Sequence, residues 1–302
     1  MRINLDVVMA VVRVSQMATL CNLLESLLKQ AVEDNDLVEE SILERYFLFS
    51  LAWSAGGMLE LDHRIKFDEF LRGESEYMPP REEGETDLLY EYYVDDDTGD
   101  WAHWNLQIPD FTYDPKMEFA QAFVPTLDST RYQFLLTLST RLSQPMLVCG
   151  DGGTTKTATI MNYMNNQLAA KPDDFQMKMI NFSFHTSHNL FQLTLESVVE
   201  KRKGRNYGPS GGKRMFVFID DISMPEVNSW RDQLTNEIVR QLLEGGGMYV
   251  LEPPKSIGKQ KHMAHLGGPS SRPHRDLVFA SYHSLKMPKV NRGPLDRCGK
   301  RT

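Results

Sequence analysis

The sequence has little cysteine and no long hydrophobic run. Its three cysteines, Cys21, Cys149 and Cys298, form no C-x-x-C pair, which excludes a disulfide framework and a cysteine zinc site and fits a reducing compartment. No uninterrupted apolar stretch approaches the ~18 residues of a membrane span, and the first residues lack the cleavage site of a secretion signal. We therefore expect a cytoplasmic protein without a membrane partner.

An excess of positive charge is missing as well. The formal net charge is −8, which excludes a general nucleic-acid binder, so nucleic acid is not an expected partner. Hydrophobic residues make up 41% and charged residues 25% of the chain, ordinary fractions for a folded protein. The 302 residues suffice for one large or two modest domains.

Residues 145–157, Pro-Met-Leu-Val-Cys-Gly-Asp-Gly-Gly-Thr-Thr-Lys-Thr, indicate a buried parallel strand followed by a phosphate-binding loop. The glycines allow a tight turn whose N–H groups point at one anion. The Lys156 ammonium would contact the β- and γ-phosphates and the Thr157 hydroxyl Mg²⁺, at the positive end of a helix dipole. The nucleotide-binding residues expected here are Gly150, Gly152, Gly153, Thr154, Thr155, Lys156 and Thr157.

Thr155 departs from the usual loop pattern, G-x-x-x-x-G-K-[ST], which has glycine at that position. A β-branched residue does not easily take a positive φ, so the loop either adopts a negative φ there or carries strain. A Gly-rich turn that merely precedes a lysine is the alternative. Nucleotide binding therefore needs further support.

That support comes from Met215-Phe-Val-Phe-Ile-Asp220-Asp221, an apolar strand that ends in two carboxylates, as a Walker B motif does. Asp220 would hold Mg²⁺, and Asp221 would address the attacking water as the catalytic residue. Strands and helices alternate around both motifs, which predicts an α/β fold with a parallel sheet. A core strand with two solvated acids is the alternative interpretation.

The remaining parts of the chain differ in texture. Residues 1–75 have helical periodicity and predict a small α-helical domain. Residues 76–115 interleave acids with aromatics; a solvated hairpin or linker is favoured over a surface for a basic partner, because Asp97-Thr-Gly-Asp100 suits a turn. Residues 116–252 hold the two nucleotide motifs, and the basic residues 253–302 predict an irregular, disordered tail.

With these residues identified, the chain resembles an axonemal dynein heavy chain of outer-arm type, over the end of its second and most of its third AAA+ module. The most specific segments are Val124-Pro-Thr126, the loop Gly150–Thr157, Asn181-Phe-Ser183, Tyr207-Gly-Pro209, Phe218–Pro225 and Gln233–Arg240. The resemblance implies a P-loop NTPase (AAA+) domain preceded by the helical lid of the previous module. It also makes Thr155 and the Asp-Asp ending expected variants.

Further expectations come with the resemblance. ATP or ADP with Mg²⁺ would bind, and the adenine would contact Val124 and Pro125, which by spacing alone are a loop before a helix. The expected partners are neighbouring dynein AAA+ modules and other arm subunits, with microtubules reached only through a full-length chain. The location would be the cytoskeleton of a cilium or flagellum axoneme.

The resemblance is expected to stop near Glu252, as in a truncated or aberrantly spliced product or a misassembled gene model. Three functions then remain: a regulatory ATP-binding ring module with slow hydrolysis, a stand-alone P-loop ATPase, and a non-enzymatic fragment that serves as an interaction piece. Asp221 favours slow hydrolysis, because a more active site carries glutamate there.

The last expectation concerns the middle of the parallel sheet. Proteins of this class place a further strand between the loop strand and the Walker B strand, and only Leu277-Val-Phe-Ala-Ser-Tyr282 has the apolar run to supply it. Its neighbouring prolines are typical of coil. We therefore favour a destabilised sheet with open strand edges, with insertion of this run as the alternative.

Overall fold

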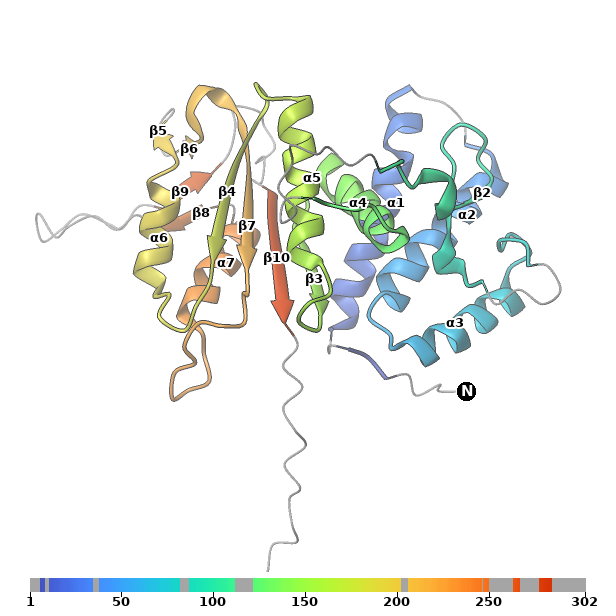
Figure 1. The fold of residues 1–302 in the computed structure, drawn as a ribbon, viewed down its shortest axis with the longest axis horizontal. Coiled ribbons are helices and arrows are strands. Elements are labelled where there is room, and N and C mark those ends of the chain that lie inside the picture. The colour runs from blue at the N-terminus through green and yellow to red at the C-terminus, as the bar shows by residue number, and fades with distance from the viewer. Residues whose placement is uncertain are drawn as a thin grey trace, which may run out of the picture.

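The computed structural model describes residues 6–8, 11–34, 38–81, 87–111, 122–201, 206–245, 247–249, 263–266 and 277–283. Figure 1 shows a mostly helical N-terminal part beside an α/β part that is built on a parallel sheet. None of the helices in these ranges has the length and hydropathy to cross a membrane.

The helical part comprises α1 (Arg13–Asp34), α2 (Glu40–Leu51) and α3 (Leu61–Glu74). A π-helical turn, η1 (Ala52–Gly56), extends α2 and places Trp53 in the core. Gly57 follows this turn with a φ of −61°. The three helices contribute side chains such as Leu23, Phe49 and Leu71 to one core. The predicted helical domain is thus confirmed.

Residues 87–107 contain the predicted hairpin, whose turn is mostly exposed and whose first strand is buried. A 3-10 turn, η2 (Leu89–Glu91), leads into β1 (Tyr92–Val94), which pairs antiparallel with β2 (Trp101–His103), and Gly99 takes a positive φ of 70° in the turn. A second 3-10 turn, η3 (Trp104–Gln107), follows. Tyr90 is 2% and Trp104 0% exposed, because both pack into the core of the helical part. The hairpin therefore belongs to that part.

The nucleotide motifs lie in a four-stranded parallel sheet of order β3-β10-β7-β4. Its strands are β3 (Met146–Gly150), β4 (Phe175–Asn181), β7 (Arg214–Asp220) and β10 (Leu277–His283). The helices are α4 (Leu127–Arg141), α5 (Lys156–Ala170), α6 (His188–Glu196) and α7 (Leu234–Gly245). This arrangement confirms the predicted α/β P-loop fold.

Successive side chains of β7 point to opposite faces of the sheet, and both sets are packed against helices. Phe216 and Phe218 are buried among side chains of α4 and α5, whereas Val217 and its alternate neighbours pack with α6 and α7. α4 also contacts α1 of the helical part, and the Ser26 hydroxyl donates to the Leu138 carbonyl at 2.8 Å. The helical part is thus joined to the sheet through α4.

β10 occupies the middle of the sheet, which is the less favoured of the two expected arrangements. It pairs in parallel with β3, Ala280 opposite Leu147, and with β7, Ala280 opposite Ile219. The apolar run supplies main-chain partners to two strands that would otherwise expose unpaired N–H and C=O groups. The structure thus differs here from the expected irregular tail.

A second, smaller sheet also includes a tail segment. Its order is β5-β6-β9-β8, formed by Glu200–Lys201, Asn206–Gly208, Met263–Leu266 and Gly247–Tyr249. The rest of residues 253–302 lies outside the described residues.

Hydrogen exchange tests the position of β10. The amides of Val278, Phe279 and Ala280 should exchange slowly in the isolated chain, at rates close to those of Val217 and Phe218 in β7, because a central strand opens only with the sheet. Mass spectrometry of peptides that span β10 measures this. Fast exchange across β10 together with slow exchange in β7 would remove β10 from the sheet.

Candidate functional site

The predicted phosphate-binding loop connects β3 to α5 as expected. Residues 151–155 turn between Gly150, the last residue of β3, and Lys156, the first residue of α5. Gly153 takes a φ of +78°, a conformation that disfavours other residues. No atom lies within 4 Å of where a side chain would begin on Gly152 or Gly153, so the loop surface is open to a ligand.

Thr155 takes a positive φ of 57° just before α5. Of the two possibilities left open by the sequence, the loop therefore adopts the strained one. A left-handed conformation costs an L-residue about 1–2 kcal/mol, and β-branched residues adopt it rarely. Strain of this kind is typical of functional loops.

Thr155→Gly should relieve that strain and stabilise the chain by about 0.5–1 kcal/mol, because glycine takes a positive φ freely. A rise of about 1–2 °C in Tm would follow, measured by calorimetry. Thr194→Gly is the matched control, since Thr194 lies inside α6 and glycine should lower the Tm there. A fall in Tm for both variants would contradict the strain at Thr155.

Lys156 is 7% exposed and is held by the loop itself. Its Nζ donates to the carbonyls of Gly150 at 3.0 Å and Asp151 at 2.5 Å, and to the Thr154 hydroxyl at 3.0 Å. A phosphate that binds in the loop would take over part of this coordination. Because the ammonium is nearly buried, its contact with a phosphate is little screened by water.

Thr157 and Asp220 meet although 63 positions separate them in the sequence. The Thr157 hydroxyl lies 3.0 Å from Asp220 Oδ2 and 3.2 Å from Oδ1. A hydroxyl and a carboxylate are hard oxygen ligands, which Mg²⁺ prefers, and Mg²⁺ usually takes its other ligands from water and substrate phosphates. In the described ranges no cluster of three or more His, Cys, Asp or Glu could hold a metal. Thr157 and Asp220 are thus two residues that could contribute oxygen ligands to a Mg²⁺ ion.

Asp221 follows at the carboxyl end of β7 with a φ of +56°. Its N–H donates to Asp220 Oδ1 at 3.2 Å, and its carbonyl accepts from Met224 N–H at 2.9 Å. The chain therefore turns sharply after Asp220, and Asp221 directly follows the end of β7 at which the Asp220 carboxylate meets Thr157.

A cavity of about 340 Å³ lies beside the loop, between α4, β3 and α5. Its lining residues are Thr126, Asp128, Ser129, Tyr132, Leu136, Val148, Cys149, Gly150, Thr154, Thr155, Lys156, Thr159 and Ile160. Thr126 begins α4 with a capping box to Ser129. Polar groups from α4 and the loop thus surround a space adjacent to the phosphate site.

Val124 and Pro125, the residues expected at the adenine, do not line this cavity. The Val124 side chain is 55% exposed, and Pro125 lines a neighbouring cavity of about 510 Å³ between α4 and α5. Their contact with adenine stays a prediction. Sequence reasoning missed that Asp128 and Tyr132 line the cavity. The sequence indicates this only through their position shortly after Thr126, at the start of the predicted helix.

Cys149 lines the cavity, and its thiol is not expected to react there. Burial raises the pKa of its thiol, and the nearby Lys156 charge only partly opposes this shift. A thiol with a raised pKa is protonated at neutral pH and is a poor nucleophile. It acts here as a small apolar lining group.

Comparison with known proteins identifies the family. A family model described as the P-loop containing dynein motor region matches residues 111–270, and one described as the dynein heavy chain AAA lid domain matches residues 1–106. This chain belongs to the dynein heavy chain family. The dynein lid match includes the hairpin β1–β2, in agreement with its packing.

Relatives show the same similarity in detail. The dynein gamma chain of the flagellar outer arm of Chlamydomonas reinhardtii is 42% identical over 96% of this chain and 7% of its own length. Dynein axonemal heavy chain 8 of Mus musculus is 40% identical over 84% of the chain and 5% of its own length. Dynein axonemal heavy chain 5 of Rattus norvegicus is 38% identical over 83% and 7%. The chain thus spans a small part of each relative.

The expected end of the resemblance at Glu252 is wrong. The dynein motor model continues to residue 270, and the similarity to the gamma chain covers 96% of the sequence. The sequence reasoning failed because the prolines on both sides of the apolar run 277–282 are typical of coil, although this run forms β10.

Proposed function

We propose that this chain is an ATP- and ADP-binding AAA+ module of an axonemal dynein heavy chain, with a regulatory site that hydrolyses ATP slowly. The observation that supports it most is the meeting of Lys156, Thr157 and Asp220 at one edge of the sheet. Two of these come from the phosphate-binding loop and one from the Walker B strand, so the motifs that define the site are assembled.

Each residue then has a role. The loop N–H groups and Lys156 hold the phosphates, while Thr157 and Asp220 hold Mg²⁺, which would neutralise phosphate charge when bound. Asp221 orients the attacking water. The polar cavity beside the loop receives the base. Val124 and Pro125 lie outside its lining, and their contact with the adenine is a separate part of the proposal.

The names of the relatives, axonemal heavy chains and a flagellar outer-arm chain, support the wider assignment. Under it, residues 1–75 together with the hairpin β1–β2 are the lid of the preceding module, the rest of residues 76–115 is a connector, and residues 116–252 together with β10 are the nucleotide-binding domain. The partners are neighbouring AAA+ modules and other arm subunits, and a full-length heavy chain provides the microtubule contact. The location is the axoneme of a cilium or flagellum.

Calorimetry with ATP–Mg and a turnover assay on the purified chain test the proposal. We expect measurable binding with slow or absent turnover. Rapid turnover would instead indicate a stand-alone ATPase. No binding at all would leave the chain as a non-enzymatic interaction piece.

A further inference from the structure

The segment that follows Asp221 needs external support to keep its shape. Asp221 has a φ of +56°, and the Met224 N–H donates to the Asp221 carbonyl across the turn at 2.9 Å. A non-glycine residue in this conformation persists only when its surroundings fix it, since it costs on the order of 1–3 kcal/mol. The supporting groups are found on α7.

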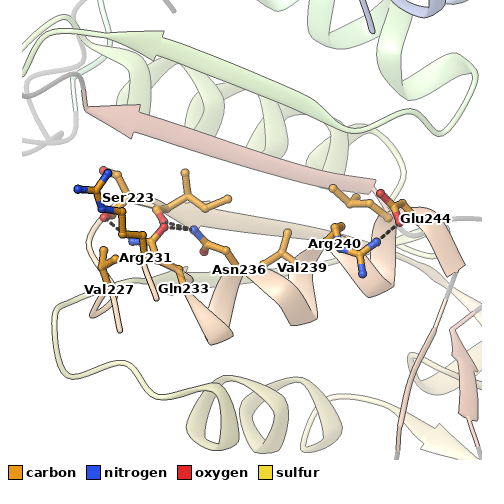
Figure 2. A pocket seen from close by; sticks show the side chains of 10 residues that line it. Ser223, Val227, Arg231, Gln233, Asn236, Val239, Arg240 and Glu244 are labelled. Carbon is orange, nitrogen blue, oxygen red and sulfur yellow. Dashed lines mark hydrogen bonds and ion pairs between the residues drawn. The ribbon is translucent and has the colours of Figure 1, made fainter. Parts of the chain in front are cut away.

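Two amide side chains hold this segment: Gln233, which directly precedes α7, and Asn236, which lies in the first turn of α7. We call these two residues the amide pair. Gln233 Nε2 donates to the carbonyls of Ser223 at 3.1 Å and Pro225 at 2.8 Å. Asn236 Nδ2 donates to the Ile222 carbonyl at 3.1 Å and to Gln233 Oε1 at 2.7 Å. Main-chain carbonyls only accept hydrogen bonds, so the NH₂ groups must face them. Figure 2 shows the pair beside Ser223.

The part of α7 that carries the amide pair is anchored in the core. Ile238 and Val239, one turn further along α7, are 7% and 4% exposed and pack in the core under β7. The Thr235 hydroxyl donates to the Thr186 carbonyl at 2.8 Å, which ties the same turn of α7 to the loop after β4. Because α7 is packed in the core, the amide pair holds residues 222–225 at a defined place relative to that helix.

The surroundings of the pair favour a positioning role over a stabilising one. The pair lines a groove of about 620 Å³ along α7, together with side chains such as Arg231 and Glu244 (Figure 2). If the pair is removed, water that enters this groove could bond the freed carbonyls, which would limit the loss of folding free energy. The segment would nevertheless lose the contacts that fix its path after Asp221.

We propose that Gln233 and Asn236 are positioning residues for hydrolysis, which hold the Asp221 carboxylate where it orients the attacking water. The inference rests on the proposed function, because it assigns them to the same reaction. Their bonds go to Ile222, Ser223, Pro225 and one another, so we expect nucleotide affinity to change little when they are replaced. A shift of about 1 Å at a catalytic group costs up to about 10²-fold in rate.

Asn236→Asp and Gln233→Glu in the full chain test this inference, because each puts a carboxylate oxygen against carbonyls that only accept. Asn165→Asp is the matched control, since Asn165 is exposed on α5. Three quantities are measured: the ATP–Mg dissociation constant by calorimetry, the single-turnover rate with protein in excess of labelled ATP, and the exchange rate of the Met224 amide.

Both variants should speed Met224 exchange and lower the turnover rate at least tenfold, with the dissociation constant within about threefold of the parent and the control unchanged. Unchanged Met224 exchange overturns the inference, whether or not ATP is hydrolysed. Faster exchange with parental turnover overturns the positioning role, as does a loss of affinity in proportion to turnover. A parent chain that binds no ATP would instead refute the proposed function, and Met224 exchange would still decide whether the pair holds the segment.

Discussion

Lys156→Ala should remove most of the affinity for ATP–Mg. Hydrogen bonds to charged groups contribute about 1.5–3 kcal/mol each, so the dissociation constant should rise ~10- to 100-fold. Lys156 is 7% exposed, and loop oxygens hold its ammonium inside the loop that we propose for the phosphates. Isothermal titration calorimetry with ATP–Mg measures the change.

Lys66→Ala is the matched control for charge, because Lys66 is exposed on α3. It should bind ATP–Mg as the parent does. Circular dichroism before titration checks that Lys156→Ala retains its helices, since the Gly150 and Asp151 carbonyls lose a donor in this variant. Parental affinity in a folded Lys156→Ala chain would refute the site assignment.

Much of the α/β part was predictable, because its signals are local. The apolar runs of β3 and β7 end in a Gly-rich loop and in two carboxylates, and parallel strands place their carboxyl ends at one edge. That rule alone brings Thr157 toward Asp220. The helices of the first 75 residues were equally readable from their periodicity.

Long-range pairing was not predictable to the same degree. β10 lies far from β3 and β7 in the sequence, and the residues on both sides of it are typical of coil. Only the strand order known for this class of protein indicated that β10 could lie in the middle of the sheet. The aromatics of the hairpin are similar. Acids beside Tyr90 and Trp104 suggested solvent, but packing against Phe49 and Trp53 decides their burial.

At the site, residue types were predictable and supporting contacts were not. Lys156 and Asp220 follow from motifs, whereas the bonds of Gln233 and Asn236 to main-chain carbonyls depend on how α7 sits over the sheet. Backbone conformation is intermediate: the sequence left two possibilities at Thr155, and gave no sign of the positive φ at Asp221.

Asp221→Glu should raise ATP turnover when this segment is part of an intact ring, by up to about 10²-fold. The aspartate carboxylate falls short of a glutamate by one C–C bond, about 1.5 Å, and a misplacement of about 1 Å at a catalytic group can cost ~10²-fold. The φ of +56° at Asp221 opposes the change, because glutamate tolerates a left-handed conformation less well than aspartate. The bonds from Gln233 and Asn236 hold the following residues and limit that loss.

Steady-state turnover at saturating ATP measures the effect in a heavy chain that carries the substitution. Asp173→Glu is the matched control, because Asp173 lies in an exposed turn before β4 and the same added methylene should leave turnover unchanged. The affinity for ATP–Mg should stay close to the parent, since Lys156, Thr157 and Asp220 are untouched. An unchanged or lower rate for Asp221→Glu would show that carboxylate reach does not limit this site, and slow hydrolysis would then need a cause outside Asp221.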